Sequence, residues 1–237
     1  MNIAGSGSLP GGEYNEEISI SGSGKIKGSA ACTEFSISGS GKVEGDLTCS
    51  GKFKISGSGK VEGGLLAPEV SVSGSGKAEG SIRTGKCHVS GSLHAGSIDC
   101  NELHVSGSVR TDVGISAEDV VVHGGITCGG LLNAERIEVV FNGGSSADAI
   151  GGSYVKIRRR GPIAGVFVRL FGGKQRELFR VAGSVEGDIL DLEYLTAEAV
   201  VGREVYIGPG CDIGRVIYSE TVEISSDAVV GSCEQNA

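Results

Sequence analysis

The chain has 237 residues, of which 39% are hydrophobic, 42 are glycine and only 4 are proline. These proportions allow a packed core, and glycine without a three-residue period excludes a collagen-like fibre. The formal net charge of −8 argues against nucleic acid as the main partner. The first residues lack the apolar core of a signal peptide, and no apolar run is long enough to span a membrane.

A repeat of about 17 residues begins near the N-terminus. Its marker is the central glycine of a Gly-Ser motif, which recurs at intervals of 16 to 18 residues. Eight registers at nearly one period indicate a solenoid. The marker glycines are Gly5, Gly22, Gly39, Gly57, Gly74, Gly91, Gly107 and Gly124.

The apolar residues within each repeat predict short β-strands. One pair of apolar columns begins at Ile18 and Ile20 and another at Ala30 and Cys32, with one outward residue between the members of each pair. In a third pair of columns, early turns have glycine followed by a larger residue, as in Gly24 and Ile26. Later turns have the larger residue first, as in Leu93 and Ala95. This exchange indicates that each turn keeps the same interior volume. Three inward pairs predict an all-β fold, a three-sided parallel β-helix of about eight turns over residues 1–140. A helical solenoid is the alternative, but the repeat is too short for a helix pair and its apolar period is two.

The sequence Gly-Ser-Gly-Lys occurs four times in this region, at Lys25, Lys42, Lys60 and Lys77. A phosphate-binding Walker A loop needs Ser or Thr after the lysine, whereas Ile, Val, Val and Ala follow here. We expect the glycines to turn corners with positive φ, and the lysines to form a solvated column. Three of them, Lys42, Lys60 and Lys77, are followed two residues later by a glutamate. The motif therefore predicts no nucleotide or other cofactor.

Cysteine and histidine residues are candidate metal ligands. Cys32, Cys49 and Cys100 share one inward column, which favours small buried hydrophobic residues over zinc ligands. Disulfides between neighbouring turns are geometrically possible but disfavoured in the reducing, cytoplasmic setting that seven cysteines without a CxxC pair indicate. His88 and His104 share an outward column and are interpreted as a solvated pair, so no metal site is predicted.

The period is lost after Val139, and residues 141–180 are predicted to be an irregular insertion. Between residues 154 and 180 there are eight basic residues and one acidic residue, a net charge of +7. One hypothesis is a contact with an anionic membrane surface or a protein partner. The alternative is a folded insertion with solvated charges. The candidate contact residues are Arg158, Arg159, Arg160, Phe167, Leu170 and Phe171.

A repeat-like pattern returns over residues 181–237, where Val205 and Val222 are again 17 residues apart. We expect a second, short β-helical stack here. The stretch YIGPGCDIGRV has the hexapeptide pattern of left-handed β-helix acyltransferases. It contains only two such hexapeptides, however, and no histidine follows residue 123. An enzyme is therefore not predicted, and neither is a small-molecule substrate.

The SGSGK-[IV]-x-G turns, together with EGDILDLEYLTAEAVVGREVYIGPGCDIGRV, resemble the bactofilins, in particular the long cytoplasmic members of Gram-positive bacteria. This resemblance covers nearly the whole chain. It implies a right-handed β-helix that polymerises without nucleotide into filaments. Such filaments act as scaffolds in cell shape or envelope processes, often at the inner face of the cell membrane.

The two ends of a β-helix expose unpaired strand edges, which favours self-association. The candidate residues are Ile3 and Leu9 at one end and Val229 and Val230 at the other. The leading hypothesis is a homopolymer, with the chain itself as the partner and cell-shape proteins or membrane as further partners. The alternatives are a monomeric or small-oligomer scaffold that binds membrane or protein, and, more remotely, an acyltransferase.

Overall fold

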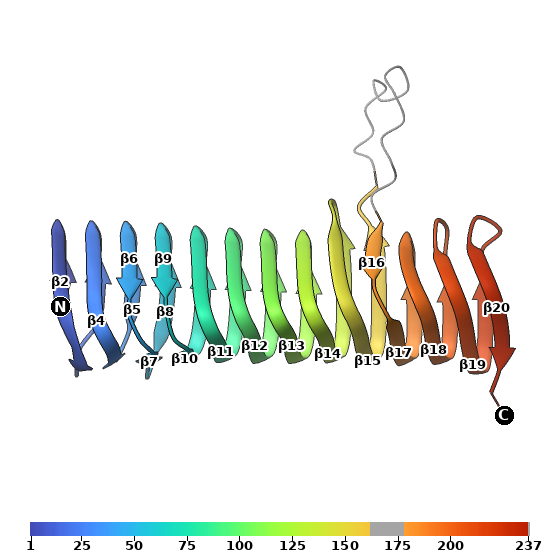
Figure 1. The fold of residues 1–237 in the computed structure, drawn as a ribbon, viewed down its shortest axis with the longest axis horizontal. Helices are drawn as coiled ribbons and strands as arrows, with labels where there is room; N and C mark the ends of the chain where they lie inside the picture. The colour runs from blue at the N-terminus through green and yellow to red at the C-terminus, as the bar shows by residue number, and fades with distance from the viewer. Residues whose placement is uncertain (162–177, 237) are drawn as a thin grey trace, which may run out of the picture.

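The structure is a computed structural model, and it describes residues 1–161 and 178–236. Every regular element in these residues is a β-strand, and all strand pairs are parallel. The strands stack into one straight rod of about 13 turns with the two termini at opposite ends (Figure 1). The predicted parallel β-solenoid with about 17 residues per turn is confirmed.

The longest strands lie in the middle turns of the rod. The first turns contain β1 (Asn2–Ile3), β2 (Ser6–Glu13), β3 (Ile18–Ile20), β4 (Ser23–Cys32), β5 (Phe35–Ile37), β6 (Ser40–Val43), β7 (Leu47–Cys49), β8 (Lys52–Ile55), β9 (Ser58–Val61) and β10 (Leu65–Val72). The middle turns contain β11 (Ser75–Val89), β12 (Ser92–Val105), β13 (Ser108–Val122), β14 (Gly125–Phe141) and β15 (Ser145–Arg159). The last turns contain β16 (Phe179–Val181), β17 (Ser184–Leu192), β18 (Leu195–Ile207), β19 (Asp212–Ile224) and β20 (Val229–Gln235).

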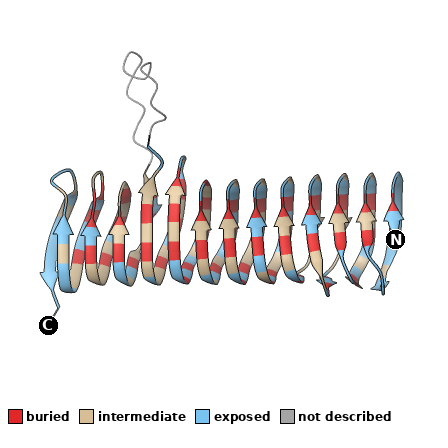
Figure 2. Ribbon diagram, turned by 180° about the vertical axis from the view of Figure 1, so that it is seen from behind, coloured by how far each residue is buried: buried red, intermediate tan, exposed pale blue. Residues whose placement is uncertain are grey.

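Equivalent residues of successive turns lie side by side, which confirms the predicted columns. Ile20 pairs with Ile37, and Ile37 pairs with Ile55. Buried residues form bands along the strands (Figure 2), and the residues that alternate with them along a strand face outward. In β11 the inward positions are Gly76 and Ala78, Ile82 and Thr84, and Cys87 and Val89. Three such pairs per turn fill the interior of the rod.

The marker glycines are required for a reason other than the predicted one. Positive φ occurs among the described glycines only at Gly12, Gly28 and Gly210. At the Ser-Gly corner a Cβ on Gly74 would instead clash with the carbonyl oxygen of Gly57, the marker of the preceding turn. The expectation of positive φ at these corners is wrong, because their need for glycine arises from close contact between stacked backbones.

Residues 145–159, which were expected to lie in the irregular insertion, form β15 and belong to the rod. Val155 pairs with Ile137 on one side and with Leu190 on the other. The loss of the Gly-Ser marker hid this turn, although the apolar column continues through it. Because β15 pairs directly with β17, the C-terminal turns continue the same stack rather than forming a separate one. The boundary of the predicted insertion at residue 141 is therefore corrected.

Candidate functional site: the outer faces and ends of the rod

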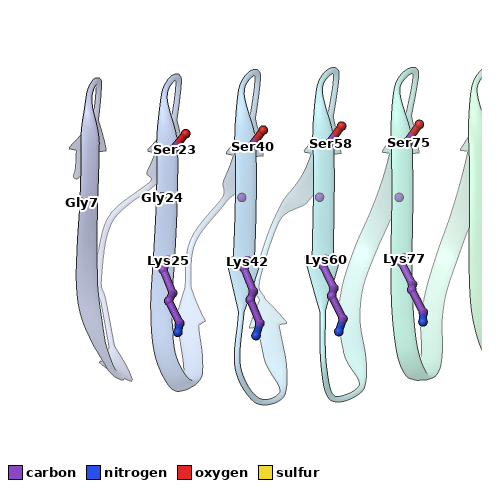
Figure 3. A pocket seen from close by; sticks show the side chains of 13 residues that line it. Gly7, Ser23, Gly24, Lys25, Ser40, Lys42, Ser58, Lys60, Ser75 and Lys77 are labelled. Carbon is purple, nitrogen blue, oxygen red and sulfur yellow. The ribbon is translucent and has the colours of Figure 1, made fainter.

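The Gly-Ser-Gly-Lys repeats form one outer face of the rod, which we call the Ser-Lys face. It consists of Ser23, Gly24 and Lys25 and their equivalents in the next three turns, which line an open groove. The lysines pair in register, Lys25 with Lys42 and Lys60 with Lys77. Figure 3 shows the lysine side chains leaning in one direction along successive turns, with the serines in a parallel column. The four ammonium groups form a row and do not converge on a single point.

Glutamates compensate the charge of this row. Lys42 Nζ lies 2.9 Å from Glu62 Oε1 in the next turn and 3.7 Å from Glu44 Oε1 in its own turn. Lys60 likewise lies 3.0 Å from Glu62 and 2.8 Å from Glu79. Hydrogen bonds from Lys42 and Lys60 lower the pKa of Glu62 below its usual value. The face is therefore a continuous Lys-Glu ladder, and its geometry differs from that of a loop that wraps one phosphate.

The histidines and cysteines lie where the sequence predicted them. The rings of His88 and His104 are stacked edge to face on the outside, with centroids 5.2 Å apart. Six cysteines are buried, and Cys233 is exposed. Within residues 1–161 and 178–236, no group of three or more His, Cys, Asp or Glu side chains has the arrangement of a metal site.

The three candidate arginines have different surroundings. Arg158 Nη2 lies 2.9 Å from Asp191 Oδ2, and Asp191 is largely buried. The guanidinium of Arg159 lies 3.8 Å from the ring centroid of Tyr194, a cation–π contact. Arg160 is exposed at the end of β15. Arg158 and Arg159 therefore contact the following turn, and Arg160 is free to contact a partner or a surface.

The apolar members of this candidate contact are Phe167, Leu170 and Phe171, and they lie outside the described residues. Lys156 Nζ lies 3.5 Å from Asp191, so two basic side chains share this carboxylate. Acidic groups of the rod thus neutralise part of the positive charge around β15. In the part of the chain that the structure describes, no helix is long and apolar enough to cross a membrane.

The N-terminal end of the rod carries two of the predicted self-association residues. The strands β1 and β2 pair on one side only, with β3 and β4 respectively. Ile3 is 8% exposed, and Leu9, which pairs with Ile26, is half-buried. The opposite edge of these strands is open in the described structure. This end therefore offers backbone hydrogen-bonding groups and a modest apolar area.

The C-terminal end exposes a larger apolar area. Val230 pairs with the buried residue Ile213 and faces inward, whereas Val229 pairs with Asp212 and faces outward with 63% of its surface exposed. Ile224 is 42% exposed although its partner Ile207 is fully buried. Ile224 was not among the predicted candidates. Its position 17 residues after Ile207 is the signal that would have identified it.

The two ends also differ in charge. Residues 181–237 contain eleven acidic and two basic residues, a net charge of −9, which exceeds the net charge of the whole chain. Exposed examples near the last turns are Glu220, Glu223 and Asp227. A contact between two C-terminal ends would therefore combine apolar attraction with repulsion between like charges, and salt screens such repulsion.

Comparisons with known proteins agree with this geometry. Residues 2–83 match the bactofilin family. That family is described as polymer-forming cytoskeletal. The matched segment contains the Ser-Lys face, the N-terminal end and the first turns of the rod. In the sequence the resemblance extends over nearly the whole chain, and the family model matches residues 2–83.

Two proteins of Bacillus subtilis strain 168 share part of the chain. The uncharacterized protein YhbF is 36% identical over 95 residues, which are 40% of this chain. The uncharacterized protein YhbE is 35% identical over 99 residues, which are 41% of this chain. The chain spans 37% of the length of each of these relatives. No solved structure matches the chain.

Proposed function

We propose that the chain is a non-catalytic scaffold that assembles with copies of itself into filaments, end to end and without nucleotide. The observation that carries this proposal is the state of the two ends. Each end has strand edges paired on one side only. At the C-terminal end two inward columns stop at Ile224, which is exposed, and at Val230, which is half-buried. An open edge of this kind is a template for a further strand. Stacking another rod would continue the columns.

The symmetry of the contact decides the form of the assembly. Contacts between unlike ends repeat without closing and give a polar filament, whereas alternating contacts between like ends give a filament without polarity. Both arrangements use only edges and apolar residues already present in the rod. Neither needs a bound nucleotide, and the Lys-Glu ladder leaves the four lysines of the Ser-Lys face paired with carboxylates.

The family description supports the cytoskeletal role, and the six buried free thiols suit a cytoplasmic location. Such a filament would provide a surface on which envelope or cell-shape proteins assemble. The regular outer columns would present each binding position repeatedly along the filament. A monomeric or small-oligomer scaffold is the competing hypothesis, and the state of assembly separates the two.

The test is sedimentation velocity and negative-stain electron microscopy of the purified chain without nucleotide. We expect filaments or large oligomers, and a monomer at every concentration would refute the proposal. Val230→Asp should shorten the assemblies by placing a charge at the C-terminal end. Ile3→Asp should do the same if the N-terminal end takes part. Val113→Asp is the matched control, because Val113 is 69% exposed in the middle of the rod.

A native reporter identifies the ends that meet. Cys233 is exposed on the last strand, and the other six cysteines are buried. A short bismaleimide should therefore link two chains through Cys233 when C-terminal ends face each other. Head-to-tail stacking brings no second Cys233 close, so the same reagent would give no linked pair despite filaments in the microscope.

A second proposal is a peripheral contact with anionic membrane through the exposed Arg160. Flotation with vesicles that contain phosphatidylserine tests it. Arg160→Glu should lower the bound fraction, and Arg158→Glu is a poorer probe because it also disrupts the ion pair with Asp191. Equal flotation of wild type and Arg160→Glu would remove this role of Arg160.

A further inference from the structure

Cys32 and Cys49 are the one pair of cysteines that the strand register places side by side in neighbouring turns. Cys32 ends β4 and Cys49 ends β7, and the two residues pair in register. Their Sγ atoms lie 3.7 Å apart, in contact as a thiol–thiol hydrogen bond. Elsewhere the register partner of a cysteine is a different residue. Cys100 pairs with Thr84, and Cys87 pairs with Val70 and Leu103.

The surroundings of the pair give the two thiols different roles. The contact with Cys49 lowers the pKa of Cys32, whereas the same contact and burial raise the pKa of Cys49. Either sulfur can donate the hydrogen bond, and Cys32 is the more exposed of the two. We therefore assign Cys32 as the nucleophile and Cys49 as the thiol that keeps its proton. Cys87 differs, because burial raises its pKa and it has no thiol partner in register.

The pair lies at the edge of the interior. Cys32 is 6% exposed and Cys49 is 3% exposed, and bends at Thr33 and at Ser50 and Gly51 follow the two strands directly. Because Cys32 lies next to a bend at the surface of the rod, a small neutral oxidant can reach its thiol over a short path from solvent. Neither thiol lies in the middle of a strand, where neighbouring side chains would cover it from both directions.

We propose that Cys32 and Cys49 form a reversible disulfide between turns when the chain meets a peroxide. The Cys32 thiolate attacks hydrogen peroxide, the O–O bond breaks, and Cys32 becomes a sulfenic acid as hydroxide leaves. The Cys49 sulfur then attacks the Cys32 sulfur, the S–S bond forms, and the second oxygen leaves as water with the Cys49 proton. Two thiols are oxidised, and one peroxide is reduced to two water molecules.

The backbone geometry permits this bond with a small adjustment. Neighbouring strands lie about 4.8 Å apart, which falls within the Cα separations of about 4.4 to 6.8 Å found in disulfides. The sulfur atoms must approach from 3.7 Å to about 2.0 Å, mainly by side-chain rotation. The backbone hydrogen bond from Ser50 N to Cys32 O, at 3.0 Å, already holds the two strand ends together.

The consequence would be local stabilisation near the N-terminal end. In a solenoid each turn contacts its neighbours only, so unfolding can begin at an end and proceed turn by turn. A bond between β4 and β7 joins two successive turns close to that end. Oxidation would therefore resist opening of the first turns and leave the distant C-terminal turns unchanged.

The experiment uses the full chain with Cys233→Ala, which removes the exposed thiol. The reduced protein is treated with hydrogen peroxide, alkylated in denaturant and digested for mass spectrometry. We expect a peptide pair linked through Cys32 and Cys49, lighter by two hydrogen atoms and separated again by dithiothreitol. Alkylated Cys32 and Cys49 after peroxide treatment would overturn the proposal, as would Cys32 oxidised to sulfinic acid without a link.

Matched variants separate this reaction from general oxidation. Cys49→Ala should abolish the linked peptide, whereas Cys100→Ala should leave it unchanged. Alanine suits the site because Ala67 follows Leu65 as Cys49 follows Leu47, one turn later. Hydrogen exchange provides a second readout: oxidation should slow exchange in β4 and β7 of the parent and not in Cys49→Ala. Equal slowing in both proteins would exclude the disulfide as its cause.

Discussion

The early turns, around residues 18–78, and the middle turns, around residues 87–139, follow the same path with opposite distributions of interior volume. In the early turns Ile55 lies against Gly59, and a Cβ on Gly59 would lie only 2.6 Å from Ile55 Cδ1. In the middle turns Leu93 occupies the register position of Gly76, beside the smaller residue Val89. The comparison shows that each turn must fill the same interior volume, and that large and small residues can exchange places between the columns.

The outer surfaces of the two regions differ as well. Corners divide most of the early turns into short strands, such as β5 to β9 with three or four residues each. In the middle turns one strand runs almost around the turn, as β13 does over Ser108–Val122. The Lys-Glu ladder is confined to the early turns, and His94 replaces the lysine after Lys77. The bactofilin match ends at residue 83, close to this change. The segment matched to the family thus nearly coincides with the turns that carry the Lys-Glu ladder, whereas the 17-residue repeat continues beyond it.

The largest expected effect comes from removing the bulk that fills the early turns. Phe53 is 2% exposed, and its ring stacks on Phe35 with centroids 5.9 Å apart. Phe53→Ala should lower the free energy of unfolding by about 3–5 kcal/mol. Phe53→Leu, which keeps most of the volume, should cost less than about 1.5 kcal/mol. Denaturant unfolding measures both, and equal losses would show that volume does not decide stability here.

The exchange of volume between columns can be tested directly. Gly59→Val places a side chain against Ile55 and Ile37, and overpacking of this kind costs about 1–3 kcal/mol. Adding Ile55→Val, the residue type found in the middle turns, should recover part of this loss. A double-mutant cycle measures the coupling between the two positions. Strictly additive losses would contradict the proposed compensation.

Two glycine corners provide the next comparison. A Cβ on Gly74 would meet the backbone of the preceding turn, whereas a Cβ on Gly143, at the corner between β14 and β15, would have no atom within 4 Å. Gly74→Ala should therefore destabilise the rod by about 1–3 kcal/mol. Gly143→Ala should leave the thermal midpoint nearly unchanged. Similar midpoints for the two variants would exclude close backbone contact as the reason for the glycine column.

The smallest expected effect concerns the Lys-Glu ladder. The pKa of Glu62 is lowered in the folded state by its hydrogen bonds with Lys42 and Lys60. Its contribution is therefore present above its unfolded pKa of about 4.3 and is lost as the pH falls through the lower folded value. Since the pairs are exposed, Glu62→Gln should reduce stability only slightly at pH 7. In Glu62→Gln the free energy of unfolding should also fall less steeply as the pH is lowered below about 4.3.

The control for the ladder is Glu135→Gln. Glu135 is an exposed carboxylate on the middle turns, away from the ladder. Thermal midpoints between pH 7 and pH 3 should fall in parallel for wild type and Glu135→Gln, with a shallower fall for Glu62→Gln. The difference between wild type and Glu62→Gln should also shrink in high salt, because salt screens exposed ion pairs. A salt-independent difference would point to lost packing instead.

The period and the alternation of the repeats were sufficient to predict the parallel solenoid, its three inward pairs and the columns through Ile20, Ile37 and Ile55. These features follow from local rules: alternate residues of a strand face opposite sides, and one turn has a fixed length. The resemblance to bactofilins followed from the same repeated letters. The end residues Ile3 and Val230 could also be predicted, because each lies at an extreme of a column.

Contacts between turns required the tertiary structure. Lys42 forms an ion pair with a glutamate of the next turn, and Gly74 lies close to a backbone carbonyl of the preceding turn. The sequence places Cys32 and Cys49 in one inward column, and the structure shows that their sulfur atoms are in contact. The sequence pattern did not assign β15 to the rod, because this turn lacks the Gly-Ser marker. The strand nevertheless pairs with both neighbouring turns. Sequence periodicity specifies which residues face inward. The distances between stacked turns decide which of those residues touch, and therefore which of them can react, pair or exclude a side chain.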